Sequence, residues 1–289
     1  MWFWFALGSA IVSGASVTFN KKILDRGVHS SVLSLALFAT VTLFSIPLLL
    51  SNHNSHVDAT FFLAVVVSAV VFSISKTVQL NIFKNNDLSG VYPLAAIAPV
   101  TLYILSLLFL SEQVKFVGVI GILLMALGVY TLNFRRGNKN LFHPLTHFFT
   151  NKYSMMYVGA IVLGNISAIS EKIAIKHTFP SGVFNLAFWE NFFLTLVIGS
   201  YVARTNKKWL TEIKEHFPAL VTAGVIFSLL YLLVMSGFKN GPISLVSAIK
   251  KLEVLFVLLI SFLFLGDRPT KKVYFASLIM LLAVLLIKL

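Results

Sequence analysis

Three charged residues stand close together in the apolar stretch 242–265: Lys250, Lys251 and Glu253. If a helix starts near Pro242, Lys250 lies roughly 12 Å along it, because an α-helix rises about 1.5 Å per residue. That depth is near the middle of a hydrocarbon core about 30 Å thick. Ionisable side chains at such a depth are costly, so they face a protein interior or a water-filled cavity and indicate function by default.

Two interpretations of this charged group remain open. Lys250 and Glu253 are three residues apart, so on a continuous helix they share a face and can pair. In the first interpretation the two lysines face a cavity and bind an anionic group, and Glu253 limits how anionic the ligand can be. In the second, Lys250 and Glu253 neutralise each other and Lys251 reaches toward water. The first is favoured, because even a structural pair at this depth needs a polar interior.

Two further charged residues lie deep in apolar stretches. Lys76 has the polar neighbours Ser73 and Thr77, which indicate a wet helix face, and a structural role is as compatible with it as a binding role. Glu190, beside Asn191, could contact a substrate amine, act as a protonatable coupling group, or pair with a lysine such as Lys76. An ion pair is slightly favoured, because a buried carboxylate without a partner tends to be protonated.

Aromatic residues and prolines add candidates for walls and gates. Trp189, Tyr92 and Tyr231 could line a cavity, although aromatic side chains in apolar helices more often simply pack. Pro93 and Pro99 remove backbone hydrogen bonds and predict kinks that could gate access. At the predicted helix ends, Lys21, Lys22, Glu171 and Lys172 are expected to be interfacial anchors unless those ends bend inward.

The composition places all these residues in a membrane protein. Of 289 residues, 58% are hydrophobic and 11% charged, whereas a soluble chain carries about a quarter of charged residues. Apolar runs of close to 20 residues recur along the whole chain. The absence of cysteine excludes a disulfide framework and a thiolate metal site. We expect no metal and no cofactor. Nucleic acid is not an expected partner either, because the +13 charge lies in short links that face lipid headgroups.

The apolar pattern predicts an all-α membrane protein with ten transmembrane helices. The predicted spans are 2–22, 31–50, 60–83, 88–110, 115–133, 153–175, 182–203, 217–238, 242–265 and 271–288. Residues 1–133 and 153–289 then form two five-helix repeats, joined by the linker 134–152. Residues 204–216 are amphipathic and are expected at the interface.

Internal similarity supports the repeat. Ala10–Ile23 aligns with Ala160–Ile173, and Leu105–Gln113 aligns with Ile260–Arg268. An odd number of spans per repeat inverts the second copy relative to the first. Inverted repeats of this kind are typical of secondary transporters, whose binding site lies between the repeats near the membrane midplane.

Charge in the links predicts the orientation of the chain. Most of the 23 Lys and Arg residues follow the first, third, fifth, seventh and ninth spans. By the positive-inside rule these links are cytoplasmic and both termini lie outside.

Several short motifs resemble the drug/metabolite transporter superfamily, in particular the ten-helix EamA-type permeases. The fourth and ninth spans end in similar turns, Leu108–Glu112 and Leu263–Asp267. Ala248–Lys251 is similar to the Ala-Leu-Lys-Arg that often opens the ninth helix of these permeases and to the Lys-Arg pair of distantly related sugar-phosphate and nucleotide-sugar translocators. Phe19–Lys22 and Lys172 also resemble positions of the translocators. The resemblance implies five plus five helices, transport of metabolites and cytoplasmic termini, the last in conflict with the charge distribution.

Two departures from the translocator pattern bear on the substrate. Lys251 stands where the pattern has arginine, so the planar fork that suits bidentate phosphate contact is missing. Glu253 adds a negative charge beside the lysines. Glu253 thus limits how anionic the substrate can be, and amino acids as well as nucleotide- or sugar-phosphates stay among the candidate substrates.

The favoured function is a secondary transporter of a small polar metabolite with a carboxylate or phosphate, such as an amino acid, working by alternating access. No ATP-binding loop is present, so a proton or a counter-solute would supply the energy. A lipid flippase or lipid-modifying enzyme is the alternative, although no catalytic cluster is apparent. The expected setting is a bacterial inner membrane, with the protein as a monomer or homodimer.

Overall fold

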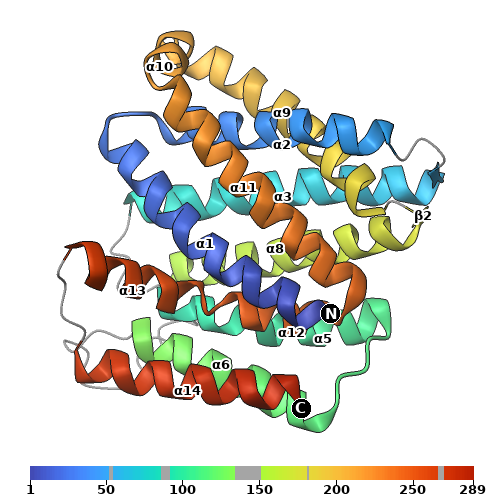
Figure 1. The fold of residues 1–289 in the computed structure, drawn as a ribbon, viewed down its shortest axis with the longest axis vertical. Helices are drawn as coiled ribbons and strands as arrows, with labels where there is room; N and C mark the ends of the chain where they lie inside the picture. The colour runs from blue at the N-terminus through green and yellow to red at the C-terminus, as the bar shows by residue number, and fades with distance from the viewer. Residues whose placement is uncertain (52–54, 86–91, 134–150, 181, 266–269) are drawn as a thin grey trace.

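The computed structural model describes residues 1–51, 55–85, 92–133, 151–180, 182–265 and 270–289. They form a bundle of long helices, and both chain ends lie near the same end of it (Figure 1). The longest helices are α1 (Trp2–Asp25), α2 (Ser30–Leu50), α3 (Ala59–Asn85), α8 (Lys152–Lys176), α9 (Gly182–Thr205) and α11 (Phe217–Asn240). The predicted linker 134–152 lies, except for its last two residues, outside the described residues.

Shorter elements complete the bundle. They are the 3₁₀ helix η1 (Tyr92–Ile97) and the α-helices α5 (Ala98–Leu110), α6 (Phe116–Asn133), α10 (Trp209–Glu215), α12 (Ile243–Lys250), α13 (Glu253–Leu265) and α14 (Lys271–Lys288). Two short strands, β1 (His56–Val57) and β2 (Thr178–Phe179), pair in antiparallel fashion outside the helices. Neither strand was predicted, because two residues are too few to show a strand pattern.

The main contacts join helices from before residue 133 to helices from after residue 152. In this way α3 packs on α8, α1 on α11, α2 on α9, and α6 on α14. The last pair approaches closely because glycines face the partner backbone. A Cβ atom on Gly121 would lie 2.6 Å from Ile287 Cγ1 and 3.0 Å from the carbonyl oxygen of Ala283. Small residues of this kind allow tight packing between membrane helices.

The stretch predicted as one helix over 242–265 is broken, and that expectation is wrong. The helix α12 ends at Lys250 and α13 begins at Glu253. Between them the amide of Lys251 donates to the Ala248 carbonyl at 3.1 Å, and the amide of Leu252 donates to the Ile249 carbonyl at 2.9 Å. These i→i−3 bonds keep the backbone satisfied where the α-helical ladder stops.

The stretch 92–110 also starts irregularly, with η1 before α5. Pro99 occupies the first turn of α5, where its missing N–H does not interrupt the helix. The proline therefore marks the start of a helix rather than a kink inside one.

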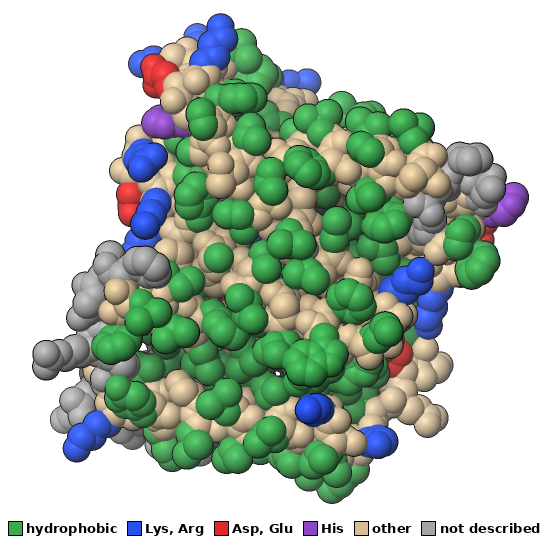
Figure 2. All heavy atoms as spheres, viewed as in Figure 1, with side chains coloured by type: hydrophobic (Ala, Val, Ile, Leu, Met, Phe, Trp, Pro, Cys, Tyr) green, Lys and Arg blue, Asp and Glu red, His purple; other side chains and the backbone are tan. Residues whose placement is uncertain are grey.

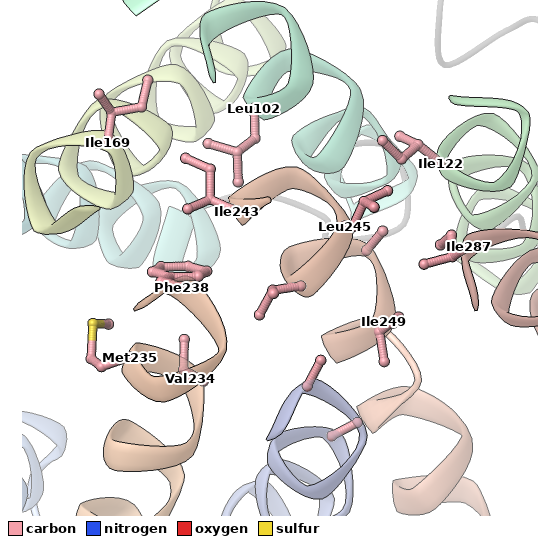
Figure 3. Close-up of a cluster of buried hydrophobic side chains, with 14 of the residues drawn as sticks. Leu102, Ile122, Ile169, Val234, Met235, Phe238, Ile243, Leu245, Ile249 and Ile287 are labelled. Carbon is pink, nitrogen blue, oxygen red and sulfur yellow. The ribbon is translucent and has the colours of Figure 1, made fainter. Parts of the chain in front are cut away.

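Apolar packing fixes α12 in the centre of the molecule. Figure 3 shows Ile243, Leu245 and Ile249 of this helix among side chains from several neighbouring helices. All three are buried, and they belong to one large cluster with Leu102 of α5 and Ile287 of α14. Because its apolar face is held on several sides, α12 gives Lys250, at its end, a defined position.

The outer surface is apolar across the helices. Figure 2 shows hydrophobic side chains spread over the face in view, with Lys and Arg mainly toward the left and right margins. Large apolar residues such as Leu108 and Phe116 are 70% and 79% exposed. Among the described residues, six helices are long and apolar enough to cross a membrane, and they are the six longest named above. Such a surface is stable only when lipid covers it.

Candidate functional site

Polar and charged side chains from seven helices gather inside this apolar bundle. They form two adjoining groups. We call the first the carboxyl cluster; it contains Ser68 of α3, Ser167 and Glu171 of α8, Glu190 of α9 and Tyr231 of α11. We call the second the lysine cluster; it contains Ser13 of α1, Lys76 of α3, Lys250 at the end of α12, Lys251, and Glu253 at the start of α13.

Glu190 is the best-held carboxyl of the site. Its side chain is 2% exposed and accepts hydrogen bonds from the hydroxyls of Ser68 and Tyr231, one at each carboxyl oxygen. The Oγ atoms of Ser68 and Ser167 lie 2.9 Å apart, and Ser167 Oγ lies 3.3 Å from Glu171 Oε1. The two serines therefore connect two carboxyl groups from neighbouring helices.

The lysine cluster lies around the break between α12 and α13. Lys76 interacts electrostatically with Lys250, Lys251 and Glu253. Its ammonium also lies 5.6 Å from the centre of the Phe72 ring, within cation–π range. Lys76 is nevertheless exposed. Lys76 therefore has an accessible surface and also interacts with the charged groups of the α12–α13 break.

The Lys250–Glu253 pair of the second interpretation and the slightly favoured pair of Glu190 with Lys76 do not form in the part of the chain that the structure describes. Among the described residues, neither Lys250 nor Lys76 has a carboxylate oxygen within 4.0 Å of its ammonium. Glu253 instead accepts a hydrogen bond from Ser13, because the break in the helix removes the shared face on which it would meet Lys250. Glu190 is bound by hydroxyl groups and does not pair with Lys76.

Lys172 lies apart from the lysine cluster. Its ammonium is 3.3 Å from Glu112 Oε1 and 2.9 Å from the Gly241 carbonyl oxygen, and it also donates to the Phe238 carbonyl. The other oxygen of Glu112 accepts from the amide of Ile243 at 2.9 Å. Lys172 is 6% exposed, so the interfacial anchor expected from the sequence is wrong.

The turn after α5 explains how Glu112 reaches this position. Ser111 has φ 51°, in the left-handed region, so the chain reverses directly after Leu110. The amide of Glu112 then donates back to the Ser106 carbonyl at 3.3 Å. Glu112 thus ties the end of α5 to Lys172 of α8 and to the first residue of α12.

The aromatic and proline candidates have mixed positions. Tyr231 belongs to the carboxyl cluster through its hydrogen bond to Glu190. Trp189 packs edge-on against Phe62, with ring centroids 5.3 Å apart, and takes part in the apolar core. The side chains of Tyr92 and Pro93 lie outside what the structure describes. Pro99 is buried at the start of α5.

Sequence reasoning missed Glu171, Ser13, Ser68 and Ser167 as site residues and did not connect Glu112 to Lys172. Weak signals existed for some of them. Ser167 and Glu171 are four residues apart and so share a helix face. Ser68 is a single hydroxyl within the apolar run Val65–Val71. Glu171 was expected at the interface, but it lies inside the bundle beside Glu190.

Comparisons with known proteins bear on the fold and the family of the chain. No curated protein matches the chain. One solved structure, titled "Crystal structure of protein", is similar with a TM-score of 0.73 at 12% identity, over 97% of this chain and 94% of the other; at this identity the likeness shows the fold alone. The sequence model of the EamA-like transporter family matches residues 1–134 and 151–289. The resemblance predicted from the motifs is thereby confirmed: this integral membrane protein belongs to the EamA-like transporter family.

Proposed function

We propose that the protein is a secondary transporter that moves a small metabolite with a carboxylate or phosphate by alternating access. The family match supports transport of small solutes across a membrane. One observation carries the choice of substrate class: Lys76, Lys250 and Lys251 meet at the break between α12 and α13, inside a bundle with a lipid-compatible surface. An acidic group of the solute would lie among these three ammonium groups.

The electrostatics of the break favour an anion. Three lysines outnumber the two carboxyls that interact with them, Glu253 and Glu171, and Glu253 already accepts a hydrogen bond from Ser13. The start of α13 also contributes, because the first N–H groups of a helix carry partial positive charge. Broken helices that present such ends near the midplane form the substrate sites of many secondary transporters. Glu190 lies in the adjoining carboxyl cluster, where it would contact an amine of the same solute.

The packing supports ten spans in two inverted repeats, 1–133 and 153–289. If the repeats are exchanged, α1 corresponds to α8, α3 to α11, α5 to α13 and α6 to α14. The contact of α3 with α8 then becomes that of α11 with α1, and the contact of α5 with α8 becomes that of α13 with α1. All four contacts occur. The two segments matched by the family model divide the chain at the same place.

Alternating access needs a closed end and an open end. The ion pair between Lys172 and Glu112, with the Gly241 carbonyl and the Ile243 amide, joins four helices at the end of the bundle where the chain termini lie. We assign this network as the closed gate. The exposed Lys76 belongs to the open side in the same state.

The test is uptake into proteoliposomes after a thermal-shift screen against amino acids, other carboxylates and phosphorylated metabolites. A compound that binds the folded state raises its apparent stability. We expect Lys250→Ala and Lys251→Ala to reduce uptake of that compound at least tenfold. Lys208→Ala, at an exposed position before α10, is the matched control and should transport normally. Unchanged uptake in both lysine variants would contradict the proposed site.

The same vesicles separate transport from the alternatives. Saturable counterflow of the compound is expected of a transporter. Scrambling of a fluorescent phospholipid without counterflow would show a flippase, and chemical conversion of the lipid would show an enzyme. The expected location of the protein is the inner membrane of a bacterium.

A further inference from the structure

In the carboxyl cluster, the two serine hydroxyls have fewer protons than there are hydrogen-bond contacts to fill. Glu190, Ser68, Ser167 and Glu171 are joined in that order by three oxygen–oxygen contacts, and Glu171 also interacts with the hydroxyl of Ser68. Each serine has one hydroxyl proton to donate. Two protons therefore serve three contacts, and an ionised carboxylate can only accept. The third proton must belong to one of the two carboxyl groups.

Tyr231 indicates which carboxyl holds it in this arrangement. Tyr231 donates to Oε2 of Glu190, and Ser68 donates to Oε1 of the same residue. Glu190 thus receives a donor on each oxygen, as an ionised carboxylate does. If Ser167 donates its proton to Ser68, the contact between Ser167 and Glu171 is filled by a proton on Glu171. The longer contact of Ser167 Oγ with the Ser68 carbonyl, 3.4 Å, adds an acceptor and no proton.

We propose that Glu171 and Glu190 form a proton-binding site that holds one proton between them and delivers it along Ser167 and Ser68. Delivery is a concerted shift of three protons: from Glu171 to Ser167, from Ser167 to Ser68, and from Ser68 to Glu190. Each serine gives one proton and takes one, so only the two carboxyls change their protonation. The result moves one positive charge from α8 to α9.

Surrounding groups make a single bound proton favourable. Glu171 and Glu190 interact electrostatically, and two neighbouring carboxyls resist being ionised together. In the described residues, the other titratable groups that face the pair are Tyr231 of α11 and Lys250 of α12; α3 contributes the hydroxyl of Ser68. Neutralising both carboxyls would leave the Tyr231 and Ser68 donors without an anionic acceptor.

The link to Lys250 gives the site a role in coupling, and this part rests on the proposed function. Glu171 interacts electrostatically with Lys250. When the proton is absent, the Glu171 carboxylate attracts that ammonium, and when Glu171 holds the proton the attraction weakens and leaves Lys250 available to an anion. Binding free energies are reciprocal, so the anion in turn strengthens proton binding. The geometry thus favours movement of a proton and an anion in the same direction.

Infrared spectroscopy of the protein in lipid vesicles tests the site directly, with the proton itself as the ligand. At neutral pH the wild type should show the carbonyl stretch of one protonated carboxylic acid, shifted in heavy water. Glu171→Gln and the double variant Glu171→Gln/Glu190→Gln should lack the band. Glu253→Gln, which alters a carboxyl outside the carboxyl cluster, should keep it. A wild type without the band, or a double variant that retains it, overturns the site whether or not the variants fold well.

A second measurement tests coupling separately. Vesicles containing a pH-sensitive dye are given the compound identified in the thermal-shift screen. Uptake should acidify the interior for wild type, and the acidification per solute should fall severalfold in Glu171→Gln. Uptake without acidification overturns the coupling. An infrared band in a protein that transports none of the compounds supports the proton site while the proposed function fails.

Discussion

The ammonium of Lys172 lies 3.3 Å from Oε1 of Glu112, and both side chains are nearly inaccessible, at 7% and 11% exposure. The pair joins the last turns of α8 to the second residue after α5. Its remaining hydrogen bonds reach the end of α11 and the start of α12. No other contact described above involves four helices through two side chains.

Removing one member of this pair should cost more than removing both. Lys172→Met leaves the Glu112 carboxylate buried without its cation, and breaking buried pairs in this way costs about 3–5 kcal/mol. Lys172→Met combined with Glu112→Gln leaves no uncompensated charge and should recover part of the loss. Thermal unfolding in detergent measures both. Lys115→Met, whose exposed ammonium contacts only the Leu289 carbonyl among the described residues, should change little. Equal losses in the single and double variants would contradict a buried pair.

Side chains larger than glycine between α6 and α14 should force the two helices apart. A Cβ atom at Gly121 would lie 2.6 Å from Ile287 Cγ1, so Gly121→Val overfills the contact. Overpacking of this kind costs typically about 1–3 kcal/mol. The same unfolding measurement applies, and Gly159→Val, where a Cβ meets nothing within 4 Å, is the control. A stable Gly121→Val protein would show that this close contact is not needed.

Stability should depend on Asp58 at neutral pH and lose that dependence in acid. Asp58 Oδ2 lies 2.8 Å from His177 Nδ1, and Asp58 Oδ1 accepts from the Phe61 amide at the start of α3. The hydrogen bond from His177, followed by the one from Phe61, holds the pKa of Asp58 below its usual value. A lowered pKa stabilises the folded state above the unfolded pKa, and the effect disappears as the pH falls through the folded pKa.

Asp58→Asn should therefore lower the apparent melting temperature slightly at neutral pH. The difference from wild type should vanish below the lowered pKa of Asp58. The effect is small because the carboxyl is exposed to solvent. Glu215→Gln, at the exposed end of α10, provides a comparison at each pH. A difference that grows in acid would have the wrong sign for this interaction.

The orientation of the chain gives a fourth prediction. Most Lys and Arg residues follow the first, third, fifth, seventh and ninth predicted spans, as Lys207 and Lys208 do. We expect these links to face the cytoplasm and both termini to lie outside. A C-terminal alkaline phosphatase fusion should be active, and a C-terminal green fluorescent protein should be dark. The reverse result would support the cytoplasmic termini implied by the family resemblance.

Much of the fold could be predicted because the membrane imposes length and hydrophobicity on each helix. The ranges predicted for α2 and α14 differ from the structure by at most one residue at either end. The irregular start of the fourth span at η1 was indicated only as kinks at Pro93 and Pro99. The break after Lys250 was missed, because an apolar run looks the same whether its helix is continuous or interrupted. Hydropathy records what lipid requires, and these breaks lie inside the bundle.

The site was predictable in its charges and not in its partners. Lys76, Lys250, Lys251 and Glu190 stand out because each interrupts an apolar run. Their partners were not apparent, because Ser13 and Ser68 are small and common in membrane helices. The pairing of Lys172 with Glu112 depends on the left-handed turn at Ser111, which periodicity does not reveal.

The packing of early helices on late ones has a consequence for biosynthesis. The ribosome releases α1 and α3 first, yet their main partners, α11 and α8, are in the second half of the chain. Until the second half of the chain is made, Lys76 lies in the membrane without the charged groups near the α12–α13 break with which it later interacts. A lysine at the centre of an isolated membrane helix costs about 2.5–3.5 kcal/mol on translocation scales. The nascent first half is therefore an insertion intermediate with unmet polar surface, and α8, the first helix of the second half, begins to relieve it.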